Sequence, residues 1–387
     1  MKKFLKYTGI LLLVIVLTAG TYGVVTFPPI IAGMGAKVLC SCVYGTGRSV
    51  ESVQQQELKL VPVTWGSFEL HPEDSSATGH FLWRTSKAIY RKGLGCTLLA
   101  QRSEEQLRAQ AIALPVKPHV NADTIPWPSG DLVKDTLPAG VNYEAIRTTV
   151  RNGFTEPSPE SALNTHAVVV LYKGHIIAEE YAAGFDRHSP MMGWSMTKSI
   201  MNALVGLLVK DGKLNVDAPA LVAEWNDDRK NITLNDLLHA SSGLAWSESY
   251  FTPGDFHNMF THSDDKGGYA AAKPLEAPPN TLFEYSSGTS NLISKIIRQT
   301  VGDSAYYKFP YERLFNKIGM RDVFIEPDAS GTFVGSSYGY ASARDWARFG
   351  LLYLNDGVWN GERILPEGWV KYTTTPAPAA PLGEYGA

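Results

Sequence analysis

The pattern of hydrophobic and polar positions divides the chain into three parts of different character. The first part has three lysines within its first six residues, followed by an apolar, uncharged run from Tyr7 to Phe27. A run of that length is close to the ~20 residues that cross a bilayer as one helix. The lysines predict a cytoplasmic tail over residues 1–6 and a body outside the cytoplasm, periplasmic or extracellular. We expect residues 7–27 to be an uncleaved transmembrane anchor, with a cleaved signal peptide as the alternative.

The second part, residues 28–140, has short apolar stretches between glycines, prolines and polar runs. Phe81–Trp83 and Cys96–Leu99 have the composition of strands, and Glu104–Ala111 has that of a short helix. Five prolines between Leu114 and Ala139 predict a linker. We interpret this part as a small accessory module, mainly β, without a motif that carries chemistry.

The third part, residues 141–387, has stronger periodicity. Ala167–Tyr172 and Ile176–Tyr181 flank a Lys-Gly-His turn and predict a β-hairpin. Trp246–Pro279 has the composition of a loop and is a candidate lid. Helices are expected over residues 143–154, 195–210, 232–239, 291–300 and 343–354. A hairpin followed by helices predicts an α/β (α+β) domain with an antiparallel sheet and a helical insertion.

Composition bears on two questions, the class of partner and the state of the cysteines. A net charge of −3 gives no basic field, which argues against nucleic acid as a partner. Cys40, Cys42 and Cys96 all follow the apolar run, where an export compartment permits disulfides. One bridge from Cys96 to either Cys40 or Cys42 is expected, which would leave one thiol over. No histidine pair stands near them at ligand spacing, so a metal site is a poor interpretation.

Ser195 and Lys198 are the strongest candidates for chemistry. Residues three apart on a helix share one face, where an amine can take the proton of a hydroxyl and make it a nucleophile. An apolar helix follows to Lys210, which places Ser195 in a first turn whose N–H groups can bind an oxyanion. The plain alternative is an N-cap serine. Ser263 and Lys266 have the same spacing, but glycines and aspartates surround them.

Tyr285 is the candidate for a third proton-transfer group. It follows a proline-rich loop and precedes a run of serines and threonines at the mouth of a predicted helix. A loop tyrosine in that position can act as a general base or proton shuttle. The alternative is a packing tyrosine beside a capping sequence.

Together these segments resemble the serine β-lactamase and penicillin-recognising superfamily, particularly its class C-like esterases and 6-aminohexanoate-dimer (nylon-oligomer) hydrolases. The S-x-x-K motif of that group matches Ser195 and Lys198, and its Y-x-N or Y-x-S motif matches Tyr285 and Ser287. Two further segments, residues 237–244 and 342–350, are similar to its L-L-x-H-x-S-G-L and T-A-R-D-x-A-R-F-G sequences. The resemblance covers residues from about 143 to 387.

The resemblance implies a β-lactamase-like fold and hydrolysis of a small ester, amide or lactam through an acyl-enzyme, without a cofactor. Ser195 would attack the carbonyl while Lys198 and Tyr285 move protons. Ser287 would lie near Lys198, and the aromatic residues Trp194 and Trp246 are candidate substrate-binding residues. A D-alanyl peptidase or β-lactamase activity is the alternative within the enzyme class. A catalytically inactive, membrane-anchored binding protein is the alternative outside it; the oligomeric state is open.

Two features of the third part do not fit this resemblance: one family motif is missing, and one sequence matches the motif of a different class of hydrolase. The family's third motif, K-T-G or H-x-G, has no match after Asn291, so we expect a fold that is incomplete at the C-terminus and a chain that is poorly active alone. Gly335–Gly339 matches the G-x-S-x-G nucleophile elbow of α/β-hydrolases. That mechanism needs a later histidine, and the last histidine is His262.

Overall fold

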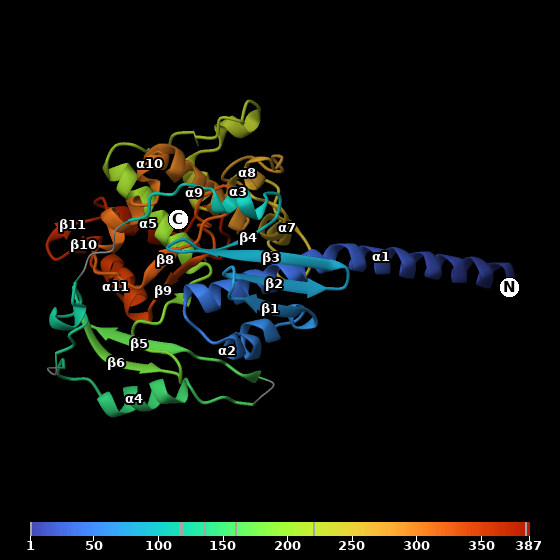
Figure 1. Ribbon diagram of the computed structural model, residues 1–387. Helices are drawn as coiled ribbons and strands as arrows, with labels where there is room; N and C mark the ends of the chain where they lie inside the picture. The colour runs from blue at the N-terminus through green and yellow to red at the C-terminus, as the bar shows by residue number, and fades with distance from the viewer. Residues whose placement is uncertain (1, 116–119, 135–136, 159–160, 220, 384) are drawn as a thin grey trace. The chain divides into compact units, whose positions relative to one another are not determined.

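The computed structural model describes residues 2–115, 120–134, 137–158, 161–219, 221–383 and 385–387. They divide into two compact units, each described here by itself (Figure 1). The N-terminal unit contains residues 1–91, 96–107 and 247–264. The C-terminal unit contains residues 92–95, 108–246 and 265–387. The chain therefore passes between the units more than once.

A long helix and a four-stranded sheet with the order β1-β2-β3-β4 form the N-terminal unit. Its elements are α1 (Lys2–Cys40), the π-helical turn η1 (Ser41–Gly45), α2 (Val50–Gln55), η2 (Glu57–Lys59), η3 (Val63–Trp65), β1 (Ser67–His71), β2 (Ser76–Phe81), β3 (Arg84–Arg91), β4 (Gly95–Leu98), α3 (Glu104–Arg108) and α7 (Asp255–His262). The predicted strand at Phe81–Trp83 is wrong. Leu82 has a φ of 52°, which turns the chain between β2 and β3.

Helix α1 changes character along its length. It is the one helix among the described residues that is long and apolar enough to cross a membrane, a property that signal sequences share. Its large described side chains are exposed as far as Val25, whereas the segment from Pro28 onward is largely buried against the sheet (Figure 1). The close approach needs glycine, since a Cβ at Gly79 would lie 2.2 Å from the Ala32 carbonyl oxygen. The helix thus runs past Phe27, where the sequence predicts the anchor to end.

A disulfide closes the core of the N-terminal unit. Cys40 at the end of α1 is bonded to Cys96 in β4, with a Cα–Cα distance of 6.0 Å. This is one of the two pairings that the sequence left open. Cys42, in the turn after α1, is buried and lies outside the bridge.

The C-terminal unit combines helices with small antiparallel sheets. A hairpin pairs β5 with β6, a second sheet has the order β7-β9-β8, and β10 pairs with β11. Its elements are η4 (Ala122–Thr124), α4 (Tyr143–Asn152), β5 (Ala167–Tyr172), β6 (His175–Tyr181), β7 (Met191–Met192), α5 (Met196–Lys210), η6 (Asp228–Asn231), α6 (Leu234–Leu238), α8 (Lys266–Ala271), α9 (Ser287–Val301), α10 (Asp303–Tyr306), η7 (Tyr311–Phe315), β8 (Val323–Ile325), β9 (Gly339–Ala341), α11 (Ala343–Leu354), β10 (Val358–Trp359), β11 (Glu362–Arg363) and α12 (Trp369–Thr374).

Helix α5 lies at the centre of this unit's core. Its side chains are buried almost continuously from Ile200 to Leu208, as its apolar composition predicts. It contacts α9 and β9, so the start of α5 is held against both. The predicted mixture of helices and antiparallel sheets is confirmed. The segment from Trp246 to Pro279, predicted as a loop, instead contains α7 and α8.

Candidate active site

A tight turn presents Ser195 at the start of α5. Ser195 is the N-cap residue, and Trp194 before it has a φ of 43°. Gly193 ties the turn to β9, because its N–H donates to the Gly339 carbonyl oxygen at 2.8 Å. A Cβ at Gly193 would lie 2.3 Å from the Trp346 ring, so only glycine fits this close contact. The turn leaves Ser195 exposed at the mouth of a buried helix.

Lys198 reaches back to Ser195 from the next turn of the helix. Its Nζ lies 3.3 Å from Ser195 Oγ and 3.5 Å from Ser287 Oγ. It also donates to the backbone carbonyl oxygen of Ser336 at 3.0 Å. The amine is therefore held between the two serine hydroxyls that the sequence singled out and a carbonyl that it did not.

Tyr285 and Ser287 come from the start of α9. Ser286 caps this helix by accepting a hydrogen bond from the Thr289 N–H, which fixes the backbone on both sides of the cap. Ser287 is buried, and the half-buried ring of Tyr285 has its centroid 4.8 Å from Lys198 Nζ. The structure thus brings Ser195, Lys198, Tyr285 and Ser287 together.

Asn291 and Ser336 complete the surroundings of the amine, and the sequence did not indicate their part in it. Asn291 Nδ2 donates to Ser336 Oγ at 3.1 Å, and Asn291 Oδ1 accepts from the Ser336 N–H at 3.2 Å. Both residues are fully or almost fully buried. The paired hydrogen bonds fix the Ser336 backbone whose carbonyl oxygen contacts Lys198.

A cavity of about 150 Å³ opens beside these groups. Ser195, Lys198 and Tyr285 are among its polar lining residues, and Leu237, Leu238 and Ile293 are among its apolar ones. Tyr385, Gly386 and Ala387 also line it, and the Tyr385 ring stands edge-on to Tyr285 at 5.7 Å between centroids. A small apolar group beside a polar reaction centre fits this arrangement.

The two predicted substrate-binding tryptophans are not among the described residues that line this cavity. Trp194 is 43% exposed in the turn directly before Ser195, with its ring centroid 6.5 Å from that of Tyr338. Trp246 packs against the start of α9, where a Cβ at Gly288 would lie 2.5 Å from its ring. Trp246 therefore packs against the segment that follows Tyr285, and Trp194 is part of the turn that carries Ser195.

The two competing serine motifs have different surroundings. Ser337, the serine of the G-x-S-x-G match, is buried, and its Oγ lies 3.0 Å from that of Ser336. It precedes β9 rather than joining a strand to a helix, so a nucleophile elbow is excluded here. Ser263 ends α7 and Lys266 begins α8, so this pair does not share one helix.

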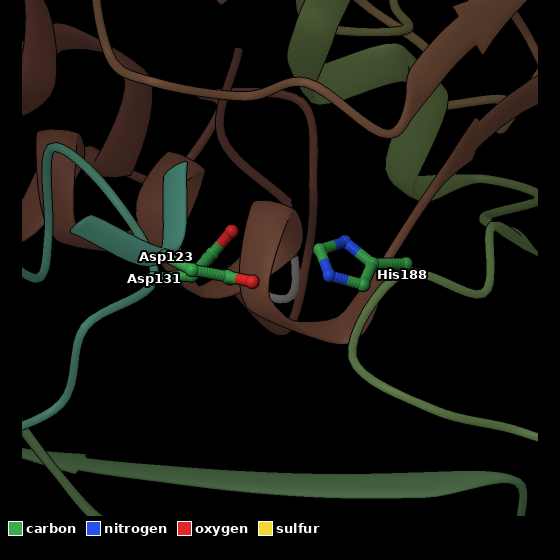
Figure 2. Close-up of side chains that lie close together, drawn as sticks. All are labelled: Asp123, Asp131 and His188. Atoms are coloured by element: carbon green, nitrogen blue, oxygen red, sulfur yellow. The ribbon is translucent and has the colours of Figure 1, made fainter. Parts of the chain in front are cut away.

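Asp123, Asp131 and His188 form a cluster of another kind within the C-terminal unit (Figure 2). One ligand-type atom from each lies within 4.8 Å of the others, a spacing that would suit a metal ion. Arginines already occupy the carboxylates, however. Arg187 pairs with Asp123 at 2.9 Å, and Arg348 pairs with Asp131 at 2.6 Å. The cluster is therefore best described as part of an ion-pair network.

Arg348 is the centre of that network and belongs to the Ala-Arg-Asp-Trp-Ala-Arg-Phe sequence of α11. Its guanidinium also pairs with Asp345 at 2.7 Å, and all three charged groups are buried. Burial by itself would raise the pKa of Asp131, but the hydrogen bond and charge of Arg348 hold that pKa below its ordinary value. The charged residues of this sequence thus have a structural role in the core of the C-terminal unit.

Comparison with known proteins identifies the family of the chain. The family model described as "Beta-lactamase" matches residues 151–384, more than half of the chain. The chain belongs to the β-lactamase family. Its fold is β-lactamase-like, and the family resemblance expected from the sequence is confirmed. This family membership is independent of any assignment of roles to individual side chains.

Several relatives of this β-lactamase family chain are hydrolases. The 6-aminohexanoate-dimer hydrolase of Paenarthrobacter ureafaciens is 26% identical over 230 residues, which are 54% of this chain and 56% of that one. The chain thus spans little more than half the length of this curated relative. A structure from Bacteroides dorei assigned as a β-lactamase has a TM-score of 0.50 at 17% identity, over 63% of this chain and 76% of that one. A Bacillus anthracis structure assigned as a 6-aminohexanoate-dimer hydrolase has a TM-score of 0.48 at 24% identity, over 56% and 62%.

Proposed function

We propose that this β-lactamase family protein is a serine hydrolase that acts on small esters or amides through an acyl-enzyme, with Ser195 as the nucleophile. The observation that carries the proposal is the 3.3 Å contact between Lys198 Nζ and Ser195 Oγ at the opening of a buried helix. A neutral amine has two N–H bonds and one lone pair. Donation to Ser336 O and Ser287 Oγ would orient the lone pair of Lys198 toward the Ser195 hydroxyl.

The proposed reaction divides the proton transfers between two groups. Lys198 takes the Ser195 proton as Oγ attacks the substrate carbonyl carbon, and the negative charge that develops on the carbonyl oxygen faces the Ser195 N–H at the helix start. Tyr285 passes a proton to the leaving group, which departs and leaves the acyl group on Oγ. Lys198 then returns the proton taken from Ser195 to the Tyr285 phenolate, so both groups are restored. Water attacks the ester carbonyl carbon while Lys198 takes one of its protons, the bond between that carbon and Oγ breaks to release the acid, and the same proton passes to Ser195 Oγ.

The cavity and the comparisons favour a small acyl group. A cavity of about 150 Å³ with leucine and isoleucine in its lining suits a small apolar group beside Ser195. The curated relative is named for a dimer of an amino acid, so a linear amide is a natural candidate beside short esters. D-alanyl peptidase or β-lactamase activity and a purely binding protein are the competing functions.

A hydrolysis panel separates these functions. Short p-nitrophenyl esters, linear amides, a cephalosporin and a D-Ala-D-Ala peptide are offered to the full chain and to the variants Ser195→Ala and Ser263→Ala. We expect turnover of an ester or linear amide that Ser195→Ala abolishes and Ser263→Ala retains. Preferred turnover of cephalosporin or D-Ala-D-Ala peptide would transfer the assignment to the competing enzymes. Turnover unaffected by Ser195→Ala would refute the proposed nucleophile.

We also propose that α1 anchors the protein in a membrane with the hydrolase domain outside the cytoplasm. The exposed apolar side chains of α1 as far as Val25 support a lipid environment, and the Cys40–Cys96 disulfide supports an oxidising compartment. Alkaline carbonate extraction tests this placement. The intact chain should stay in the membrane fraction, whereas release of a shortened chain would identify a cleaved signal peptide.

A further inference from the structure

The length of exposed helix in α1 defines where a bilayer would end. The exposed part of α1 that carries no charged residue extends from Tyr7 to Val25, a stretch of roughly 28 Å at the rise of an α-helix. The hydrocarbon core of a bilayer is about 30 Å thick, so this stretch spans it once. Tyr7 and Tyr22 stand near the two ends, at the depth where aromatic rings gather in membrane proteins. Val24 then marks the outer lipid–water interface.

One end of the sheet in the N-terminal unit lies at that level. Trp83, in the turn between β2 and β3, donates its indole N–H to the Val24 carbonyl oxygen of α1 at 2.7 Å. This contact fixes the β2–β3 turn beside the proposed outer end of the membrane span. The helix continues without a break from this point into the core of the same unit, so the turn and the span are held in one arrangement.

The same end of the sheet is apolar and uncovered. Leu82 and Trp83 are 55% and 56% exposed, and Trp65 is 58% exposed. Ser67 pairs with His80, so Trp65 precedes β1 at the end where Leu82 follows β2. Leu60 and Val61, just before Trp65, are also exposed. Large apolar side chains gathered at one end of a small sheet mark a contact surface rather than ordinary scatter.

Charge differs between the two ends of the sheet. The basic residues Lys59 and Arg84 adjoin the apolar end, directly before Leu60 and directly after Trp83. The opposite end carries the carboxylates Glu73 and Asp74 in the turn between β1 and β2, together with the basic residues Arg91 and Lys92 at the end of β3. Basic side chains can extend from an apolar surface toward lipid headgroups, whereas carboxylates are repelled by anionic ones. The carboxylates of Glu73 and Asp74 thus lie at the end away from Trp83, which fits a bilayer at the Trp83 end.

We propose that the sheet end formed by Trp65, Leu82 and Trp83 inserts into the outer lipid–water interface beside α1. The inference rests on the proposed membrane anchor and adds a second, peripheral contact with the same bilayer. Tryptophan suits this role because its ring is largely apolar while its N–H keeps a polar partner. The contact would hold the N-terminal unit upright on the membrane instead of leaving it on a freely pivoting helix.

Site-directed fluorescence tests the contact on the full chain in phosphatidylcholine–phosphatidylglycerol vesicles. An environment-sensitive nitrobenzoxadiazole label is placed on Leu82→Cys, on Glu73→Cys at the opposite end of the sheet, and on Val14→Cys within α1. Wild-type chain treated with the same reagent gives the background, because Cys42 is buried. Quenchers attached to lipids at shallow and deep positions then report the depth of each label.

We expect shallow lipid quenchers to affect the Leu82 label at least about threefold more strongly than the Glu73 label, with Val14 quenched from the deep position. Equal, weak quenching at Leu82 and Glu73 with a quenched Val14 would overturn the interfacial contact and keep the anchor. An unquenched Val14 would overturn the anchor itself. A Leu82 label shielded from aqueous iodide but untouched by lipid quenchers would identify a protein partner or second copy, which also contradicts the proposal.

Discussion

Asn291 holds Ser336 through two hydrogen bonds. Its Nδ2 donates to Ser336 Oγ at 3.1 Å, and its Oδ1 accepts from the Ser336 backbone N–H at 3.2 Å. The carbonyl of the same residue accepts from Lys198 Nζ at 3.0 Å. A buried amide on α9 is thereby linked through one backbone segment to the amine beside Ser195. This makes Asn291 a positioning residue in the proposed mechanism.

Replacing Asn291 should therefore disturb the reaction without removing any reacting group. We expect Asn291→Ala to lower kcat for p-nitrophenyl esters by about 10- to 100-fold with a smaller change in KM, because small displacements of a catalytic group are costly. The pH dependence of kcat should also shift, since Lys198 loses a fixed acceptor. Asn291→Asp keeps the acceptor for the Ser336 N–H and should retain more activity. A loss confined to thermal stability, with an unchanged pH profile, would leave Asn291 with a merely structural role.

Lys198 and Tyr285 should each be indispensable to turnover. Lys198→Ala removes the proposed base and Tyr285→Phe removes only the phenol hydroxyl, so the latter preserves the ring beside Lys198. Each variant should lower ester turnover by at least ~10². Steady-state assays with p-nitrophenyl esters measure the effect. A decrease of less than tenfold in either variant would remove that residue from the mechanism.

The buried ion pairs of Arg348 with Asp131 and Asp345 predict that replacing Arg348 lowers the free energy of unfolding strongly. Arg348→Met leaves the carboxylates of Asp131 and Asp345 without their shared guanidinium, and breaking a buried pair in this way costs about 3–5 kcal/mol. Arg363→Met is the matched control, because its pair with Asp356 is exposed and should contribute below about 1 kcal/mol. Urea unfolding followed by fluorescence compares the two. Similar midpoints for both variants would refute the structural role of the network.

Stability should fall in mild acid partly because of His239. Burial lowers the pKa of this imidazole, whose Nδ1 lies 3.0 Å from the Asn235 carbonyl oxygen. Below about pH 6.5 the unfolded chain binds a proton that the folded chain still excludes, so the free energy of unfolding decreases as the pH falls. His239→Gln removes this difference. Its melting temperature should change less between about pH 7 and pH 5 than that of the wild type, and an equal change would contradict the assignment.

Local geometry explains which features could be predicted from the sequence. Ser195 and Lys198 lie within reach of each other because three residues along a helix return to the same face. The β5–β6 hairpin follows from Lys173 and Gly174, which both adopt positive φ at the turn. The pairing of Cys96 required the fold, since Cys40 and Cys42 are only two residues apart and α1 decides which one faces β4.

Features that depend on distant contacts could not be predicted. The Lys198–Ser336 contact joins residues 138 apart, and a backbone carbonyl leaves no signature in the sequence. Helix α8 forms from the weak helix sequence Lys-Gly-Gly-Tyr-Ala-Ala because Asp265 caps it and α9 packs against it. Pro28 and Pro29 would ordinarily end a helix, yet α1 continues as it packs on the sheet. In both helices tertiary packing outweighs the local preference of the sequence.

The central claim is that Ser195 forms a covalent acyl-type adduct with assistance from Lys198. Mass spectrometry of the full chain after reaction with a fluorophosphonate tests it most directly, because it identifies the modified residue. We predict one adduct on the peptide that contains Ser195, absent from Ser195→Ala and strongly reduced in Lys198→Ala. An adduct on another residue, or one that persists in Ser195→Ala, would contradict the account.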